Sequence, residues 1–116
     1  MYAVIFEVIP TAEGKQTYLE IAANLREFLE GRDGFISIER FQSLVDENKI
    51  LSLSFWRDEA SIQKWRNLLV HREAQQAGRQ QLFESYRIRV AKVERDYSDT
   101  QRQQAPADSR QLHDAS

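Results

Sequence analysis

Hydrophobic residues in the first third of the chain follow first the pattern of a strand and then that of a helix. Residues 1–9 are mostly β-branched or aromatic, and Pro10, which has no N–H to donate to a strand ladder, closes the run. Apolar residues then recur at spacings of three and four, followed by Gly31 and Gly34, which favour a helix end. The recurring residues are Tyr18, Ile21, Ala22, Leu25, Phe28 and Leu29. We predict a strand and then an amphipathic helix.

Two further strands are predicted before residue 57. Phe35–Gln42 is rich in residues that favour strands, and residues 49–56 alternate strictly between two faces. One face holds Leu51, Leu53 and Phe55, and the other holds Ser52, Ser54 and Trp56. Because residues 45–48 are typical of a turn, the two strands are predicted to form an antiparallel hairpin.

The second half of the chain predicts one more helix and one more strand. Asp58 suits a helix N-cap, and one stripe of the helix that would follow holds Ile62, Trp65 and Leu69. The composition favours helix beyond this stripe, and we expect a break or kink near Val70 or Gly78. Residues 86–93 alternate again and are predicted to form the last strand.

The predicted order β-α-β-β-α-β defines the fold class. With right-handed crossovers it gives a ferredoxin-like α+β plait, an antiparallel four-stranded sheet with both helices on one face, over residues 1–97. The first two strands are apolar at nearly every position, so the second face of the sheet is also expected to be apolar. We therefore expect two copies to pack sheet to sheet as a symmetric homodimer. Residues 98–116 form a polar C-terminal tail, expected to be dispensable for the core.

Composition excludes several classes of protein. A chain of 116 residues with 41% hydrophobic and 29% charged residues fits one globular domain, and no apolar stretch approaches the roughly 20 residues of a membrane-spanning helix. The absence of cysteine excludes disulfides, thiolate nucleophiles and cysteine-ligated zinc or iron–sulfur sites. The first residues lack the pattern of a secretory signal, so we expect a cytoplasmic protein.

Charge is distributed unevenly. Residues 62–95 hold eight Lys and Arg against three Glu, a net charge of +5, while the rest of the chain carries −7. A basic third of this kind attracts nucleic acid or an anionic small molecule, or it is a solvated or interface surface. RNA binding ranks last, because the strands lack the stacking aromatics of an RNA-recognition motif.

The ionisable residues offer one candidate for acid–base chemistry. His71 is the only side chain of residues 1–97 whose ordinary pKa lies near neutrality, since the other histidine, His113, lies in the tail. Surface or capping roles are the alternative for His71. Its nearest acidic neighbour, Glu73, is two positions away, which does not suit a metal site on a helix. No nucleophile elbow or glycine-rich phosphate loop is present, so we expect neither metal nor organic cofactor.

Aromatic residues suggest where a small molecule would bind. If the second helix and the sheet part slightly, Trp56, Trp65, Ser54 and His71 would line an apolar pocket with few polar groups. The alternative is that Trp65 is a core residue, because it shares a stripe with other apolar residues. An ideal helix places positions 65 and 71 about 240° apart. A pocket that uses both residues therefore requires the break near Val70.

Several segments together resemble a known family. The stretches AVIFEVIP, GFISIERF, SLSFWRDEASIQKWR, HREAQQAGRQQLF and YRIRVAKVERDY are similar to the antibiotic biosynthesis monooxygenase domain, over about residues 2–97. The resemblance implies a dimeric α+β barrel. It places Trp65 beside the substrate and His71 where some cofactor-independent members have a tyrosine or histidine.

The sequence departs from the family pattern at residues that are typical of haem degradation and of cofactor-independent oxygenation. Haem-degrading relatives carry an axial histidine about ten residues after the tryptophan and an asparagine in the first strand, where this chain has Gln75 and Phe6-Glu7. Haem degradation is therefore not expected. Cofactor-independent members often have an asparagine one turn before the tryptophan, and Ser61 stands there.

The leading functional hypothesis is a cofactor-independent monooxygenase that acts with O₂ on a small electron-rich aromatic compound of the quinol or anthrone type. His71 would deprotonate the substrate, and Trp65 with Trp56 and Ser54 would enclose it. Arg66 or Arg87 would stabilise the oxyanion. The alternative is a non-catalytic dimeric module that binds a small molecule or acts in a stress response. A pocket with a buried His71 favours the enzyme, and a fully packed Trp65 favours the binding module.

Overall fold

The computed structural model describes residues 1–76 and 82–114, with the side chains of residues 1–67 and 82–110. The elements follow the predicted order, with one helix added at the end. They are β1 (Tyr2–Pro10), α1 (Lys15–Leu29), β2 (Phe35–Gln42), β3 (Ile50–Trp56), α2 (Glu59–Gln76), β4 (Phe83–Lys92) and α3 (Ala107–Asp114). No helix in the described ranges is long and apolar enough to cross a membrane.

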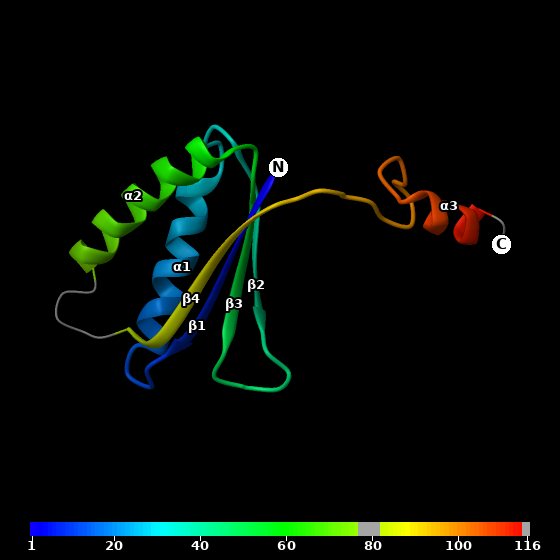
Figure 1. Ribbon diagram of the computed structural model, residues 1–116. Coiled ribbons are helices and arrows are strands. Elements are labelled where there is room, and N and C mark those ends of the chain that lie inside the picture. The colour runs from blue at the N-terminus through cyan, green and yellow to red at the C-terminus, as the bar shows by residue number, and fades with distance from the viewer. Residues whose placement is uncertain (77–81, 115–116) are drawn as a thin grey trace.

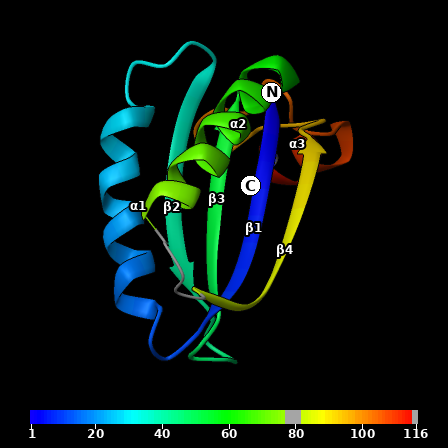
Figure 2. The ribbon, with the colours of Figure 1, turned by 90° about the vertical axis from the view of Figure 1, so that its left-hand side faces the viewer.

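The four strands form one antiparallel sheet in the order β2-β3-β1-β4. Both α1 and α2 lie on one side of this sheet, and the other side carries no helix of the domain (Figure 1). Figure 2 shows α1 and α2 toward β2, β3 and β1, while β4 lies at the far edge of the sheet. The ferredoxin-like α+β plait predicted from the element order is confirmed.

The predicted break near Val70 is wrong. Helix α2 runs without interruption from Glu59 to Gln76, because its composition favours helix throughout this range. Gly78, the other predicted position of a break, lies outside the described residues.

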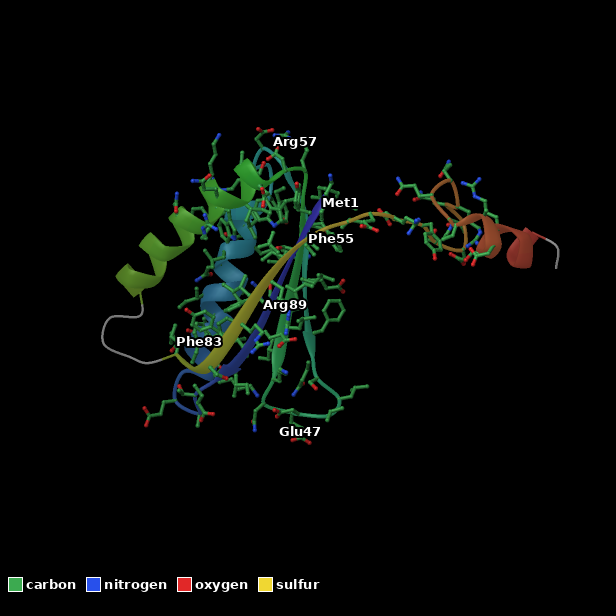
Figure 3. The ribbon with its side chains drawn as sticks, viewed as in Figure 1. Met1, Glu47, Phe55, Arg57, Phe83 and Arg89 are labelled. Atoms are coloured by element: carbon green, nitrogen blue, oxygen red, sulfur yellow. The ribbon has the colours of Figure 1, made fainter. Side chains whose placement is uncertain are left out.

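The two faces of the sheet carry different residues. Cross-strand partners share a face, and the pairs Tyr2–Trp56, Phe6–Ser52 and Val8–Ile50 lie on the side of the helices. The other side, which we call the open face, pairs Ile5 with Leu53 and Ala3 with Phe55. In β3 the serines are therefore buried under the helices, while Leu51, Leu53 and Phe55 remain half-buried on the open face. Figure 3 shows Phe55 and Arg89 on the open face and Phe83 on the helix side.

The core lies between the helices and the sheet in three neighbouring clusters. Their buried members are Val8, Tyr18 and Ile50; Ile21, Leu25 and Leu82; and Leu29, Trp56 and Ile62. Helix α1 contributes every apolar residue of its predicted stripe except Phe28, which is exposed. Phe28 lies at the edge of that stripe, on a part of the helix surface that does not face the sheet.

At one end of the sheet, charged side chains link the turn that follows α1 to the turn that precedes α2. Arg57 donates two hydrogen bonds to Asp33, at 2.8 and 3.0 Å, and a third to Asp58 at 3.0 Å. Asp58 accepts from the backbone N–H of Ser61 at 2.9 Å, which confirms its predicted role as the N-cap of α2. These bonds fix the start of α2 over the sheet.

The chain continues beyond the sheet as a projecting segment. After the backbone N–H of Val93 donates to the carbonyl of Met1 at 2.9 Å, residues 94–114, here called the C-terminal arm, leave the domain and end in α3 (Figure 1). The sequence pattern did not predict α3. Pro106 just before the helix and Asp108 in its first turn are typical of a helix start, and they are the signal that would have indicated it.

Candidate functional site

The two tryptophans form a stack between α2 and the sheet. Trp56 is 0% exposed, and its ring lies 6.3 Å from that of Trp65 with an interplanar angle of 29°. Phe35 contacts Trp56 edge-on at 5.3 Å. Trp65 is half-buried and packs against two core clusters, so it joins α1, α2 and the sheet. The stack holds α2 at a defined height above β3.

The serines of β3 are placed under this stack. Ser54 Oγ accepts a hydrogen bond from the indole Nε1–H of Trp56 at 2.9 Å, and this bond satisfies a donor that would otherwise be buried without a partner. The structure thus brings the predicted residues Trp56, Trp65 and Ser54 together. They contact one another and the neighbouring core residues between α2 and the sheet.

An uncovered strip of sheet lies beside α2. Tyr86, Ile88 and Val90 are on the helix side of β4 by their register with β1, yet they are 64%, 53% and 46% exposed. Helix α2 covers the neighbouring strands and leaves β4 open (Figure 2). Between α2 and β4 is a cavity of about 200 Å³, lined by Glu59, Ile62, Gln63, Arg66 and Val90. We call the cavity and the exposed side chains of β4 the β4 groove.

Aromatic rings form the end of the β4 groove at which β4 begins. Phe6 lies edge-on to Phe83 at 5.9 Å and to Tyr86 at 6.0 Å, and the Phe83 and Tyr86 rings are 6.2 Å apart. Sequence reasoning did not assign Phe6, Phe83 or Val90 to a site. The signal was present in β4, where Tyr86, Ile88 and Val90 alternate with Arg87 and Arg89. An apolar floor with a polar rim is typical of a small-molecule site.

The two predicted arginines are on opposite faces. Arg66 lines the cavity of the β4 groove. Arg87 pairs with Glu7 in the register of β1 and β4, which places it on the open face together with Arg89. Glu7 forms ion pairs with Arg89 at 3.4 Å and with Lys49 at 3.6 Å. Of the two, only Arg66 is positioned to meet a molecule bound in the β4 groove.

His71 lies in α2, but its side chain is outside the described side chains. Because α2 is continuous, positions 65 and 71 are separated by about 240° in one direction around its axis, or about 120° in the other. The break that would turn both residues toward one pocket is not there. Among the described residues, no group of three His, Asp or Glu side chains is arranged to hold a metal ion.

The sequence of residues 1–77 matches the antibiotic biosynthesis monooxygenase family. This chain belongs to that family. It is 48% identical over 93 residues to a protein named jasmonate monooxygenase from Pyricularia oryzae, with 80% of this chain and 43% of that protein covered. It is 32% identical over 94 residues to the uncharacterized Bacillus subtilis protein YqjZ, with 81% and 80% covered. This family member thus spans less than half the length of the Pyricularia relative.

Solved structures share the fold of the family. The Mycobacterium tuberculosis protein Rv0793 matches with a TM-score of 0.70 at 16% identity, covering 84% of this chain and 98% of its own. The heme-degrader MhuD from the same organism, with two hemes bound in its active site, matches with a TM-score of 0.60 at 16% identity, covering 83% and 99%. Because these structures are covered almost completely, part of the present chain lies outside their fold.

The first strand of this family member differs from the pattern expected for haem degradation. Phe6-Glu7 stands near the position where the family resemblance implies an asparagine, and the Phe6 ring packs against Phe83 and Tyr86. This position offers an apolar surface and no hydrogen-bond donor. The other expected difference, Gln75, has its side chain outside the described ones.

Proposed function

We propose that this protein is a monooxygenase that binds a small, largely apolar compound in the β4 groove. The observation that carries the proposal is the exposed apolar strip of β4 beside α2, within a domain of the antibiotic biosynthesis monooxygenase family. Burial of Tyr86, Ile88 and Val90 under a ligand would remove apolar surface from water. The ligand would thereby complete the cover that α2 leaves unfinished.

The first substrate class is an electron-rich aromatic of the anthrone or quinol type. When the ring CH₂ of an anthrone becomes a carbonyl, one atom of O₂ enters the product and the other leaves as water. The substrate loses four electrons and two C–H protons, and these match the reduction of O₂ by four electrons. No external reductant, flavin or metal is then needed, which is why we assign the reaction to the cofactor-independent type.

The protein would contribute position, exclusion of water and one proton transfer. The floor of the β4 groove would enclose the rings, while the stack of Trp65 on Trp56, with Ser54 beneath it, holds α2 beside the groove. Arg66 at the cavity rim would stabilise the oxyanion formed when the substrate is deprotonated. His71 is the candidate base because no other side chain of residues 1–97 has an ordinary pKa near neutrality.

Oxygen consumption with an anthrone, together with product mass, tests this proposal. His71→Ala is expected to lower kcat by about 10²-fold with the fold intact, which is the usual scale of a positioned acid–base group. Val90→Asp is expected to raise KM, because a carboxylate on the groove floor opposes binding of an apolar ring. Leu44→Asp, in the exposed β2–β3 turn, is the matched control. If the wild-type protein binds the anthrone without turnover, the non-catalytic binding module takes the place of the enzyme.

A second substrate class follows from the Pyricularia relative. Jasmonate is a carboxylate, and Arg66 offers a guanidinium in the lining of the cavity, where Ile62 and Val90 supply the apolar part and Glu59 and Gln63 the other polar groups. If the ligand is a carboxylate of this kind, Arg66→Ala should raise the dissociation constant for jasmonate and leave that for a neutral anthrone unchanged. Lys64→Ala, an exposed residue of α2 that does not line the cavity, is the control. An equal loss for both ligands would assign Arg66 to the fold rather than to carboxylate recognition.

The proposed assembly is a homodimer packed through the open face. Phe41 is 44% exposed there, and Leu51, Leu53 and Phe55 are half-buried with no element of their own domain above them. Apolar surface of this extent favours association with a second copy. Sedimentation at micromolar concentration is expected to give twice the 13.6 kDa mass of the chain. A compact monomer would overturn the assembly.

A further inference from the structure

The C-terminal arm leaves the domain toward the side of the open face. It begins after Val93, whose N–H still bonds to Met1, and it carries α3 away from the sheet on the side opposite α1 and α2 (Figure 1). In the view turned by 90°, α3 lies behind the sheet while α1 and α2 lie in front of it (Figure 2). The arm therefore extends into the space that a second copy on the open face would occupy.

The arm has a defined shape that its own hydrogen bonds maintain. Ser98 Oγ accepts from the backbone N–H groups of Thr100 and Gln101 at 3.2 and 2.9 Å. Arg102 donates to the carbonyls of Ser98 at 3.1 Å and Ser109 at 3.4 Å, and its guanidinium lies 5.7 Å from the centre of the Tyr97 ring. The arm thus folds back on itself into a hook that ends in α3.

The described side chains of this hook, those of residues 94–110, form almost no apolar interior. Among its described side chains, Ala105 is the one buried hydrophobic residue, and Tyr97 is 42% exposed. Ordering a backbone costs conformational entropy, which a methyl group and a few exposed hydrogen bonds do not offset. A hook of this composition needs an outside surface to hold it.

Charge indicates which surface this is. Residues 94–114 hold five acidic and three basic residues, so the arm is acidic. On the open face, β4 presents Arg87 and Arg89, which belong to the basic third of the chain, and Arg89 also pairs with Glu7 of its own sheet at 3.4 Å. In a two-fold dimer the open face of each copy lies on the side toward which the other copy's arm extends. An acidic arm and a basic strand are complementary across that interface.

We propose that the C-terminal arm of each copy clasps the second copy of this chain, in the homodimer proposed above. Solved structures of the same fold, matched over 98% or 99% of their own length, leave about a sixth of this chain unmatched, and the arm accounts for a similar share of the chain. It lies against the partner's domain rather than its own. The contact joins the acidic hook to the basic edge of the partner's sheet and adds surface beyond the open faces.

The first test is the dissociation constant of the dimer, measured by sedimentation. A chain that ends at Val93 is expected to keep its far-UV spectrum and cooperative unfolding, while its dimer dissociates about tenfold more readily or worse. Replacing Asp96, Asp99 and Asp108 together by Asn should reproduce part of this loss of dimer affinity. It should also make the dissociation constant of the dimer less dependent on salt concentration. Replacing the acidic residues Glu13, Glu20 and Glu27 of the α1 region by Gln is the matched control, and it should leave the dimer unchanged. An unchanged dissociation constant for the shortened chain overturns the clasp.

The second test locates the arm directly. Because the chain has no cysteine, Ala107→Cys provides a single attachment point for a nitroxide at the start of α3. Nitroxide-labelled copies are mixed with ¹⁵N-labelled copies that lack the cysteine, and a label at Ala12→Cys, in the β1–α1 turn at the other end of the sheet, is the control. The clasp predicts broadened amide signals from β4 of the ¹⁵N copy only with the Ala107 label.

The outcomes separate the clasp from the dimer. Broadening confined to samples in which label and ¹⁵N share one copy would show that the arm folds onto its own domain. A dimer without broadening between copies would leave the arm free in solution. Either result overturns the clasp and leaves the homodimer intact. A full-length chain that stays monomeric at all concentrations overturns both the clasp and the homodimer. That result would leave a different protein as the partner of the arm.

Discussion

The two faces of the sheet are built from the same strands and yet differ in what covers them. On the helix side, Ser52 and Ser54 are buried beneath α1 and α2. On the open face, Leu51, Leu53 and Phe55 stay half-buried although they are the more hydrophobic residues of the strand. In a lone chain this distribution is unfavourable, because apolar area remains in water while polar groups are enclosed. It becomes favourable once a second copy covers the open face.

The sharpest contrast is between neighbours in β3. Trp56→Ala, on the helix side, removes a fully buried ring and is expected to lower the free energy of unfolding by about 3–5 kcal/mol. Phe55→Ala, on the open face, should cost about 1 kcal/mol when the chain is dilute enough to be monomeric. Urea denaturation measures both. Equal losses in the monomer would show that the two faces are packed alike and would remove the basis of the comparison.

The open face is expected to respond through assembly rather than through folding. Leu53→Asp places a charge at its centre, and we expect it to weaken the dimer by about 2 kcal/mol or more, as for a residue at the middle of an interface. Leu44→Asp, on a side chain that is fully exposed in the β2–β3 turn, should leave the dimer unchanged. Sedimentation of both variants decides the matter, and a stable dimer of Leu53→Asp would place the interface elsewhere.

The attachment of α2 to the helix side depends on a glycine. Gly34 has a φ of 85°, and a Cβ at this position would overlap the side chain of Ser61, which Asp58 holds in place. Gly34→Ala is therefore expected to cost about 1–3 kcal/mol. Gly31→Ala, with a φ of 80° and open space around it, isolates the backbone cost and should lose less. Thermal unfolding that gives equal losses would exclude the contact with Ser61 as the cause.

The smallest expected effect is a response to acid at the same end of the sheet. Hydrogen bonds from the Ser61 hydroxyl, from its backbone N–H and from Arg57 lower the pKa of Asp58 from 3.8 to about 2. The stability from this ionised N-cap is present above about pH 4 and is lost as pH falls toward 2. Asp58→Asn keeps the cap without the charge, so its difference from the wild type should shrink over that range. A constant difference would mean that the charge of Asp58 contributes nothing.

Local patterns predicted the elements of this fold because each has a strong period. The alternation of residues 49–56 predicted β3, and the spacing of Tyr18, Ile21 and Leu25 predicted α1. Alternation states that two faces differ but not which one meets the helices, and hydrophobicity alone would have placed Leu53 inside. That choice depends on the register with β1, which brings Val4 and Phe6 opposite the serines.

The candidate site was predicted less completely than the fold. Of the candidates named from the sequence, Arg66 lines the cavity, whereas Trp65 packs on Trp56 and against the core. The sequence did not indicate the floor of the β4 groove, because β4 is exposed only through the position of α2 over the neighbouring strands. The pairing of Trp65 with His71 depended on a break in α2 that does not occur. Helix composition shows that a break is tolerated near a position but not that it forms.

The stacked tryptophans also make the protein its own optical probe. Trp56 and Trp65 are the only two indoles of the chain, and both lie in one stack between α2 and the sheet. Ultraviolet emission therefore reports on a single place in the molecule, next to the β4 groove. A ligand or a displaced α2 will change the emission colour and intensity. For the homodimer proposed above, dissociation of the two copies or removal of the arm is expected to leave the emission unchanged, so fluorescence and sedimentation would monitor the two sides of the sheet separately.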